Sequence, residues 1–207
     1  MQIAILLYPG FTALDAMGPF EVLGNLPGAD TVFVAEQPGT IRNDSGKLAV
    51  LADASLAEVG SPDIVVVPGA PDTSGPVKSQ AVREWLTAVD RTTTWTTSVC
   101  TGSLVLAAAG LLTGRRATSH WLYLDELASY GVESTGERVV TDGKYVTAAG
   151  VSSGIDMGLT LAGRIAGDRV AQAIQLLIEY DPQPPYDAGS PEKAPADLVA
   201  EWRARRI

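Results

Sequence analysis

The sequence contains a single cysteine, Cys100, and a single histidine, His120, among its 207 residues. One cysteine cannot form a disulfide within the chain, and this pair supplies too few ligands for a structural zinc site. The sequence also lacks a Walker loop and a GxGxxG motif, so we expect no metal and no cofactor. The low cysteine content is typical of the reducing cytoplasm, where we expect the protein to reside.

Long apolar runs and an excess of basic charge are also missing. No run of about 18 uncharged apolar residues has the flanks of a membrane span, and residues 1–10 lack the basic start of a signal peptide. Lys and Arg number 15 and Asp and Glu 24, so the net charge is -9. We therefore expect neither a membrane nor nucleic acid as a partner. The short basic end, Arg203, Arg205 and Arg206, is interpreted as the solvated face of a helix.

What the sequence does contain is an alternation of β-like runs with amphipathic segments. Hydrophobic residues make up 46% and charged residues 19%, as in globular domains. We expect strands at 3–7, 31–35, 64–67, 95–99 and 117–119, an excursion over 42–50, and a hairpin of 139–141 with 145–147. Helices are expected over 19–26, 80–91, 104–109, 121–130, 153–166 and 170–180. This order predicts one α/β domain over 1–207, a sandwich around a mainly parallel sheet, with an extended proline-rich segment at 181–195.

The candidate functional residues lie on turns that should meet at one edge of this sheet. In a parallel sheet, ligands bind beyond the carboxyl ends of the strands. Four turns follow predicted strands, at 8–14, 68–71, 100–102 and 119–121. We therefore expect these four segments to surround one site.

Cys100 is the first candidate, in the segment Ser98-Val99-Cys100-Thr101-Gly102 between a β-like and a helix-like run. At a strand-to-helix turn a thiol can lie at the positive end of a helix dipole, which favours the thiolate. A lone cysteine is most often a small buried hydrophobe. The small, polar pair that follows weighs against that interpretation, because it lets backbone N–H groups face whatever binds above the sulfur. We interpret Cys100 as a nucleophile at an elbow.

Asp15 is the candidate acid beside the sulfur. An Asp just before a helix is often its N-cap, but the helix is expected to begin near Pro19. Two anions cannot share one small space cheaply, so Cys100 and Asp15 should titrate as a coupled pair in which one keeps a proton. A protonated Asp15 beside a thiolate would be a general acid. Glu21 is a second candidate, with the simpler interpretation of a helix-surface residue.

Three further positions have both a functional and a structural interpretation. His120 ends a short predicted strand, where it can assist the ionisation of Cys100 or be an ordinary, satisfied histidine. Gly69 allows a positive φ and close approach of the backbone, so that its N–H and that of Thr101 can form an anion hole; the alternative is a tight turn. Residues 150–154 precede a helix and can form a loop over the site.

Motifs along nearly the whole chain resemble a known family. They are Leu14-Asp15, Gly18-Pro19, Pro68-Gly69, Ser98 to Leu106, Ala108 to Leu112, Gly114 to Thr118, His120-Trp121, Gly150-Val151, Gly154 to Asp156, Leu159 to Leu161, and Tyr180, Pro182, Pro184-Pro185 and Ala188 to Pro191. These segments resemble the PfpI-like superfamily, which has the class I glutamine amidotransferase-like fold, and within it they look most like the isocyanide hydratases. Other members often carry Glu in place of Asp15, and His in place of Thr101. The second difference argues against protease or amidase chemistry.

The resemblance implies a flavodoxin-like three-layer sandwich and a homodimer. It implies cysteine-dependent, cofactor-free hydration of isocyanides, a small-molecule substrate class, with Cys100 as nucleophile, Asp15 as acid and Thr101 as a polar neighbour. The remaining expected contacts to substrate or oxyanion are Gly69, Ala70, His120, Gly150 and Val151. Two alternatives stay open. One is glyoxalase-like carbonyl chemistry on another electrophile, and the other is a ligand or redox sensor like the sensing half of AraC-like regulators. Direct DNA binding is not expected, because the sequence ends at Ile207 without room for a helix-turn-helix pair.

Overall fold

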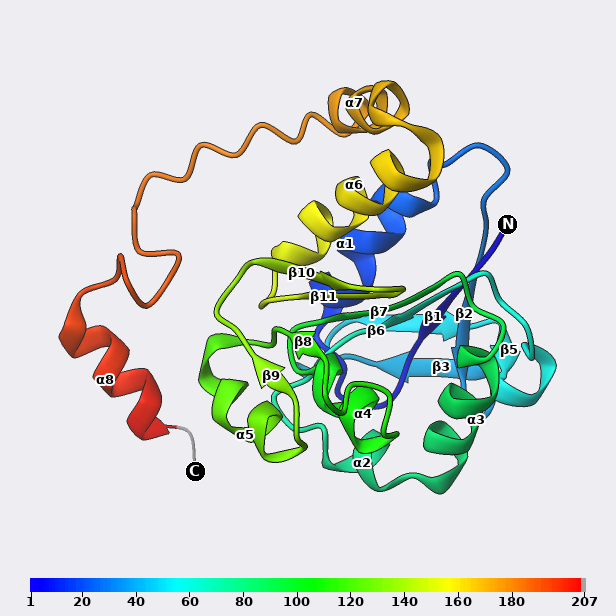
Figure 1. Ribbon diagram of the computed structural model, residues 1–207, viewed down its shortest axis with the longest axis horizontal. Helices are drawn as coiled ribbons and strands as arrows, with labels where there is room; N and C mark the ends of the chain where they lie inside the picture. Colours follow the sequence, from blue (N-terminus) through cyan, green and yellow to red (C-terminus); the bar gives the residue numbers. More distant parts are fainter. Residues whose placement is uncertain (206–207) are drawn as a thin grey trace.

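The computed structural model of the protein describes residues 1–205. Within them, a seven-stranded sheet has the order β10-β11-β7-β6-β1-β2-β5 and forms the centre of the molecule (Figure 1). Its strands are β1 (Gln2–Leu6), β2 (Asp30–Ala35), β5 (Ala54–Ser55), β6 (Ile64–Val67), β7 (Trp95–Val99), β10 (Val139–Asp142) and β11 (Tyr145–Ala148). Every pairing is parallel except that of β10 with β11. The mainly parallel sheet is therefore confirmed.

Helices cover both faces of the sheet and complete three layers (Figure 1). One face carries α1 (Ala13–Leu23), α6 (Ser153–Ala166) and α7 (Asp168–Leu177), and the other carries α2 (Ser74–Lys78), α3 (Gln80–Asp90), α4 (Gly102–Ala108) and α5 (Leu124–Ser129). The predicted apolar face of α3 is buried as expected, through Val82, Trp85, Leu86 and Val89. This arrangement confirms the flavodoxin-like three-layer sandwich.

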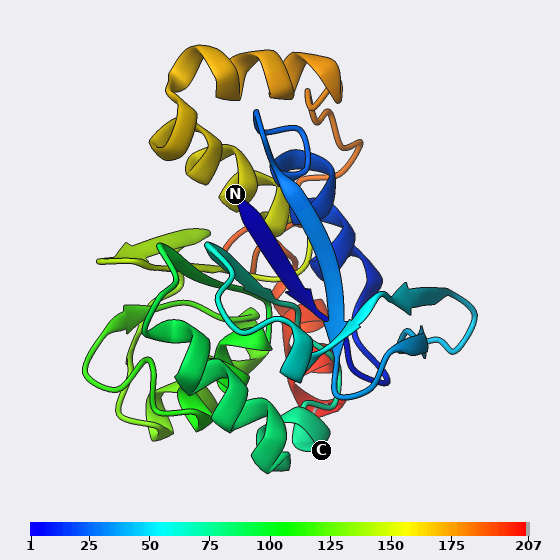
Figure 2. The same ribbon diagram turned by 90° about the vertical axis from the view of Figure 1, so that its right-hand side faces the viewer.

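Smaller elements complete the body. The excursion expected at 42–50 is a hairpin of β3 (Gly39–Arg42) with β4 (Ala49–Ala52), which projects from the side of the molecule (Figure 2). Two short strands, β8 (Arg116–Ala117) and β9 (Glu133–Ser134), form a separate pair. The 3-10 helices η1 (Leu56–Glu58) and η2 (Trp121–Tyr123) precede β6 and α5. Several of these elements, namely β5, β9, η1 and α2, were not expected from the sequence.

The main correction concerns α1, which begins at Ala13 and not near Pro19. Proline inside a helix lacks the N–H that would continue the hydrogen-bond ladder, so the sequence favoured a start at Pro19. Tertiary packing outweighs the cost of the hydrogen bond that is missing at Pro19, since α1 packs against α6 and Gly18 lies close to Ile155. A Cβ at Gly18 would come within 3.2 Å of Ile155 Cγ1. As a result, Asp15 lies in the first turn of α1.

The other boundary errors are small. The strand expected at 117–119 is β8, one residue earlier and shorter, and the helix expected over 121–130 is divided into η2 and α5. The helix expected to reach Tyr180 ends at Leu177, and Glu179 has a positive φ of 50°. No helix in residues 1–205 is both long and apolar enough to cross a bilayer.

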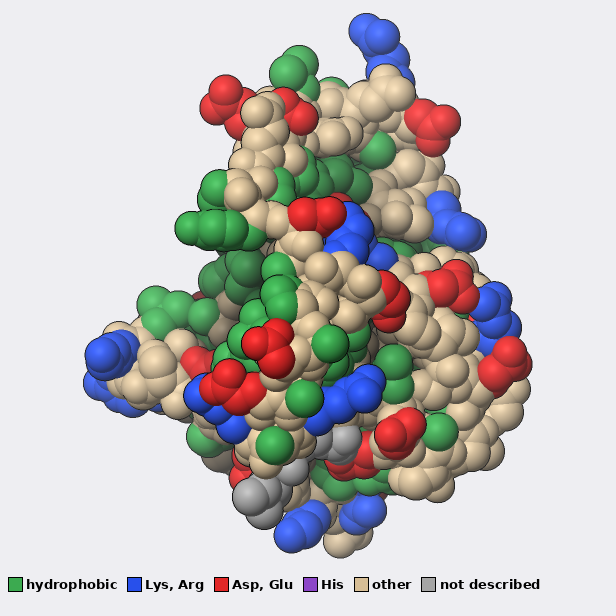
Figure 3. Space-filling view, turned by 90° about the vertical axis from the view of Figure 1, so that its left-hand side faces the viewer, with side chains coloured by type: hydrophobic (Ala, Val, Ile, Leu, Met, Phe, Trp, Pro, Cys, Tyr) green, Lys and Arg blue, Asp and Glu red, His purple; other side chains and the backbone are tan. Residues whose placement is uncertain are grey.

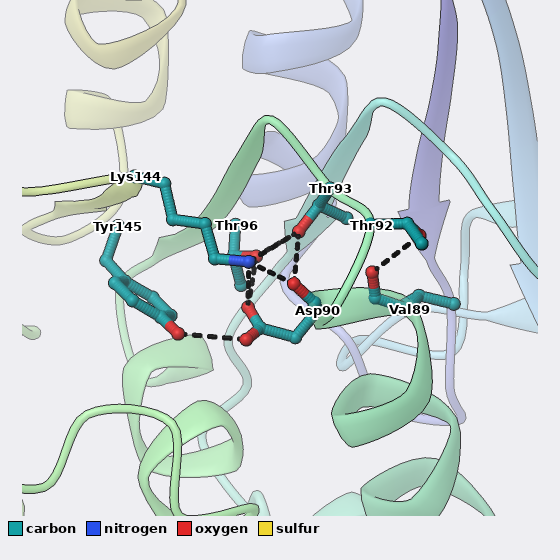
Figure 4. A network of polar contacts seen from close by, with 7 residues as sticks. All are labelled: Val89, Asp90, Thr92, Thr93, Thr96, Lys144 and Tyr145. Atoms are coloured by element: carbon teal, nitrogen blue, oxygen red, sulfur yellow. Dashed lines mark hydrogen bonds and ion pairs between the residues drawn. The ribbon is translucent and has the colours of Figure 1, made fainter.

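A polar network fixes the start of β7, at the end of the sheet remote from the predicted site (Figure 4). Asp90, at the end of α3, accepts hydrogen bonds from Thr96 Oγ1 at 2.7 Å and from the Tyr145 hydroxyl at 2.9 Å. The Lys144 ammonium lies 3.2 Å from the same carboxylate. These contacts join α3, β7 and β11, and hence help to set the register of the strand that leads to Cys100.

The chain after α7 leaves the body. Residues 181–189 are exposed and lie in no helix or strand, whereas residues 191–193 of the segment expected to be extended form a turn. The chain then enters α8 (Ala196–Arg205), which lies beyond α5 in Figure 1. Arg203 and Arg205 are exposed on this helix, as expected for a solvated basic end, and Arg206 lies outside the described residues.

Candidate active site

Cys100 occupies the turn between β7 and α4 with a φ of 59°. This left-handed conformation is uncommon for a residue with a side chain, and it is maintained by contacts on both sides of the residue. The Cys100 N–H donates to the Ala148 carbonyl at 2.9 Å, and the Cys100 carbonyl accepts from Ser103 Oγ at 3.2 Å and Ser119 Oγ at 3.1 Å. The side chain is 5% exposed. The turn therefore presents a mostly buried thiol in a fixed direction.

Asp15 is fully buried beside this thiol. Its Oδ2 accepts a hydrogen bond from the Gly69 N–H at 3.0 Å. Its Oδ1 has no hydrogen-bond partner that meets standard geometry within the described residues. Burial raises the pKa of Asp15 from 3.8 to about 7, although the Gly69 N–H and the Cys100 thiol act in the opposite direction. Asp15 can therefore take up and release a proton near neutral pH.

The thiol itself does not favour ionisation in this site. Burial raises the pKa of Cys100 well above its ordinary value, and the neighbouring Asp15 carboxylate raises it further. The Thr101 N–H acts against both effects and lowers the pKa. We expected the start of the helix to favour a thiolate, but desolvation dominates, and the thiol keeps its proton.

The expected anion hole of Gly69 and Thr101 is not available in the form predicted. The Gly69 N–H already donates to Asp15, and the next one, of Ala70, donates to Thr101 Oγ1 at 2.8 Å. Thr101 Oγ1 in turn donates to the Ala70 carbonyl at 2.7 Å. Gly69 also lacks the positive φ that we considered. The close approach of its backbone to Thr101 does require glycine, since a Cβ at Gly69 would lie 2.5 Å from the Thr101 nitrogen. Gly69 and Ala70 thus hold Asp15 and Thr101 in place.

Tyr8 is a residue of the site that the sequence analysis did not select. It follows β1, is 5% exposed, and its hydroxyl donates to the Pro68 carbonyl at 2.7 Å. That carbonyl and the Gly69 N–H belong to one peptide unit, so Tyr8 and Asp15 bind its two ends. Burial and the nearby acidic groups raise the pKa of Tyr8, which keeps its hydroxyl a donor. Its position directly after the first strand was the only signal in the sequence.

His120 and residues 150–151 lie near the thiol but do not all contribute as expected. His120 Nδ1 accepts the Leu122 N–H at 3.3 Å and so caps η2, while the described groups that act on the thiol are Asp15 and Thr101. His120 and Cys100 line the same cavity, and the Cys–His dyad stays a prediction. Gly150 lies behind the imidazole, where a Cβ would come within 2.2 Å of His120 Cδ2, and of this loop Val151 reaches the cavity above Cys100. Glu21, the second candidate acid, is exposed on α1.

A cavity of about 460 Å³ opens above Cys100. Its lining residues come from all four predicted turns, the β3–β4 connection, η2, the loop before α6 and α8. They are Thr12, Asp44, Ala70, Pro71, Cys100, Thr101, His120, Leu122, Tyr123, Val151, Trp202 and Arg205. Figure 3 faces the side of α8 and shows hydrophobic side chains on and beside the C-terminal segment. The four turns therefore converge as predicted. Asp44, Leu122, Tyr123 and the two residues of α8 were not anticipated as part of the site.

Comparison with known proteins places this arrangement in a family. The sequence profile described as DJ-1/PfpI family matches residues 1–164. The chain belongs to the DJ-1/PfpI family. It is 38% identical over 205 residues to a Pseudomonas putida protein named isonitrile hydratase, an alignment that covers 99% of this chain and 90% of the relative.

A solved structure and a second relative agree with this assignment. The structure of a THiJ/PfpI family protein from Pseudomonas syringae has a TM-score of 0.92 and 37% identity, with 99% of this chain and 88% of that chain covered. An HTH-type transcriptional regulator from Pseudomonas aeruginosa is 33% identical over 80% of this chain, but the match spans 51% of the regulator. The DJ-1/PfpI family therefore includes relatives with different functions, and the site geometry has to discriminate between them.

Proposed function

We propose that the protein hydrates isocyanides to N-substituted formamides, R–NC + H₂O giving R–NH–CHO. The observation that carries the proposal is the pair formed by the Cys100 thiol and the buried Asp15 carboxyl, whose pKa of about 7 lets it transfer a proton at neutral pH. The isonitrile hydratase relative, similar over 99% of this chain, supports the same reaction. The cavity adds apolar and aromatic walls suited to a hydrophobic substituent.

The first step joins sulfur to carbon and moves one proton. Asp15, as the carboxylate, accepts the thiol proton at Oδ1 while the Cys100 sulfur attacks the terminal carbon of the isocyanide. The same carboxyl then gives that proton to the carbon, which has become an imidoyl anion, and a thioimidate, R–N=CH–S–Cys100, results. The proton ends on the carbon, and Asp15 is again ionised. A carboxyl with a pKa near 7 suits this relay because it can act in both directions.

The second step uses water and restores the thiol. Water adds to the thioimidate carbon, and Asp15 takes one water proton and passes it to the substrate nitrogen, which becomes N–H. The tetrahedral adduct, R–NH–CH(OH)–S–Cys100, then loses its hydroxyl proton to Asp15 as the C–S bond breaks and the formamide forms. The thiolate that leaves takes this proton from Asp15, so that atoms and charge balance over the cycle. Side chains and water suffice for every step.

Formation of the formamide from an aryl isocyanide tests the proposal. The wild type should release one formamide for each isocyanide consumed, and Cys100→Ala should release none. Asp15→Asn should retain the thiol but lower kcat/KM by about 10²-fold or more, the contribution typical of a positioned acid–base group. Asp30→Asn, at an exposed position, is the matched control and should behave as the wild type. Full activity in Cys100→Ala would refute the mechanism.

A ligand sensor is the second candidate, because one relative is a transcriptional regulator. In that case an isocyanide or another small electrophile would raise the melting temperature without being turned over. Glyoxalase-like chemistry is the other alternative, and turnover of methylglyoxal without formamide formation would favour it. The homodimer stays a prediction, which sedimentation analysis would test.

A further inference from the structure

One wall of the cavity above Cys100 comes from a part of the chain remote from the sheet. Trp202 and Arg205 line it together with the residues of the turns. Leu198, Trp202 and Arg205 are spaced by four and three residues, so they share one face of α8. The cavity between this face and η2 measures about 250 Å³ and is lined by Trp121, Leu198 and Trp202 among others. The apolar face of α8 is thus directed toward the site.

The two sides of the cavity differ in how firmly they are held. The floor consists of Cys100, Thr101 and Ala70, which are all buried, and two hydrogen bonds join Thr101 to Ala70. On α8 no described residue is buried, and Trp202 is 48% exposed. A ten-residue helix is only marginally stable on its own, so α8 keeps its place through its contacts with the body. Substitutions on α8 can therefore alter the cavity with little effect on the core.

The position of the thiol determines which part of a substrate meets this helix. An isocyanide carbon must reach the Cys100 sulfur at the floor, so its substituent extends away from the sheet. Leu122, Tyr123 and Trp202 line the cavity there. An indole presents a large flat surface that limits the space and also packs well against aromatic groups.

We propose that α8 is the wall that sets substrate size, with Trp202 as the specificity-determining residue for the substituent on the isocyanide. This inference rests on the proposed function for the identity of the substrate. The wall itself can be tested through the thiol without any turnover, since Cys100 is the only cysteine.

The test compares Trp202→Ala and Trp202→Phe with wild type in two assays. The first measures alkylation of Cys100 by iodoacetamide, a small reagent, and by N-phenylmaleimide, a bulky one. The second measures kcat/KM for methyl and for 2-naphthyl isocyanide. Tyr186→Ala removes an aromatic residue that is 81% exposed on the C-terminal segment and outside this cavity, and is the matched control. Urea midpoints show whether the variants keep the fold.

Trp202→Ala should raise the ratio of the alkylation rate with N-phenylmaleimide to that with iodoacetamide several-fold. It should raise the ratio of kcat/KM for 2-naphthyl isocyanide to that for methyl isocyanide about tenfold. Both changes should be smaller in Trp202→Phe. Tyr186→Ala should change neither ratio. Unchanged ratios in both Trp202 variants would overturn the proposal, whether or not isocyanides are hydrated. If the wild type makes no formamide but the alkylation ratio rises in Trp202→Ala, the wall is supported and isocyanide hydration is refuted.

Discussion

Replacement of Asp15 by Asn should stabilise the protein relative to the wild type, and the difference should grow as the pH rises. The folded protein holds the pKa of Asp15 at about 7, whereas the ordinary value is 3.8. A carboxyl whose pKa is higher in the folded than in the unfolded protein stabilises the fold at pH values below its ordinary pKa. This stabilisation is lost as the pH rises through the folded pKa. In the wild type, ionising this buried carboxyl costs stability between these two values. Asn has nearly the same shape, can still accept the Gly69 N–H and has no charge to desolvate.

The magnitude follows from the difference between the two pKa values. At about 1.4 kcal/mol for each pH unit, the change from 3.8 to about 7 corresponds to about 4 kcal/mol. The free energy of unfolding of Asp15→Asn, minus that of the wild type, should therefore increase by about this amount from about pH 4 to about pH 8. Most of the increase should fall below pH 7, and the difference should then become constant.

Urea unfolding followed by tryptophan fluorescence measures this difference at each pH. Subtracting wild type from variant removes the contributions of the other ionisable groups. Glu21→Gln removes a carboxylate from the exposed surface of the same helix and is the control, for which the difference should stay nearly flat. If the curves for Asp15→Asn and wild type ran parallel, or if the wild type gained stability relative to Asp15→Asn as the pH rose, the burial argument would be refuted.

Two further predictions concern the surroundings of this pair. In Gly102→Ala the new Cβ would lie 2.1 Å from the Val67 carbonyl oxygen, so the free energy of unfolding should fall by about 3 kcal/mol or the protein should fail to fold; a urea midpoint like that of the wild type would contradict this. Tyr8→Phe leaves the buried Pro68 carbonyl without its donor and should cost about 1–3 kcal/mol in the same assay. Tyr8→Phe should also move the pH at which the Asp15 contribution to stability levels off above pH 7, because the Gly69 N–H that binds the carboxylate becomes a weaker donor. If this pH did not move, the tyrosine would not act through the Pro68–Gly69 peptide.

The sequence was most informative where structure depends on local pattern. The apolar run of β6 and the periodic face of α3 gave correct elements, because burial of the whole strand or of one helix face determines both patterns. The start of α1 could not be predicted in the same way. It depends on packing of Gly18 against Ile155, and no local pattern encodes a contact between residues so far apart in the chain.

The same distinction applies to the site. The position of Cys100 after a strand predicted its turn, and the order of strands predicted that Asp15 would be near. The partners of individual N–H groups could not be predicted, because the bond from Gly69 to Asp15 depends on tertiary distances. The direction in which the pKa of the thiol is shifted could not be predicted for a related reason, since its burial depends on how several turns close over it. Trp202 was missed because its helix carries only a weak apolar face.

The order of strands also determines when the site can form during synthesis of the chain. β7 carries Cys100 and lies between β6, which precedes it, and β11, which the ribosome adds about 45 residues later. Until β11 pairs with it, β7 is an open edge, and the Ala148 carbonyl that binds the Cys100 N–H is missing. A nascent chain that ends before Ala148 therefore has its cysteine without the geometry of the site. The geometry of the Cys100 turn thus arises late, as a property of the nearly completed sheet.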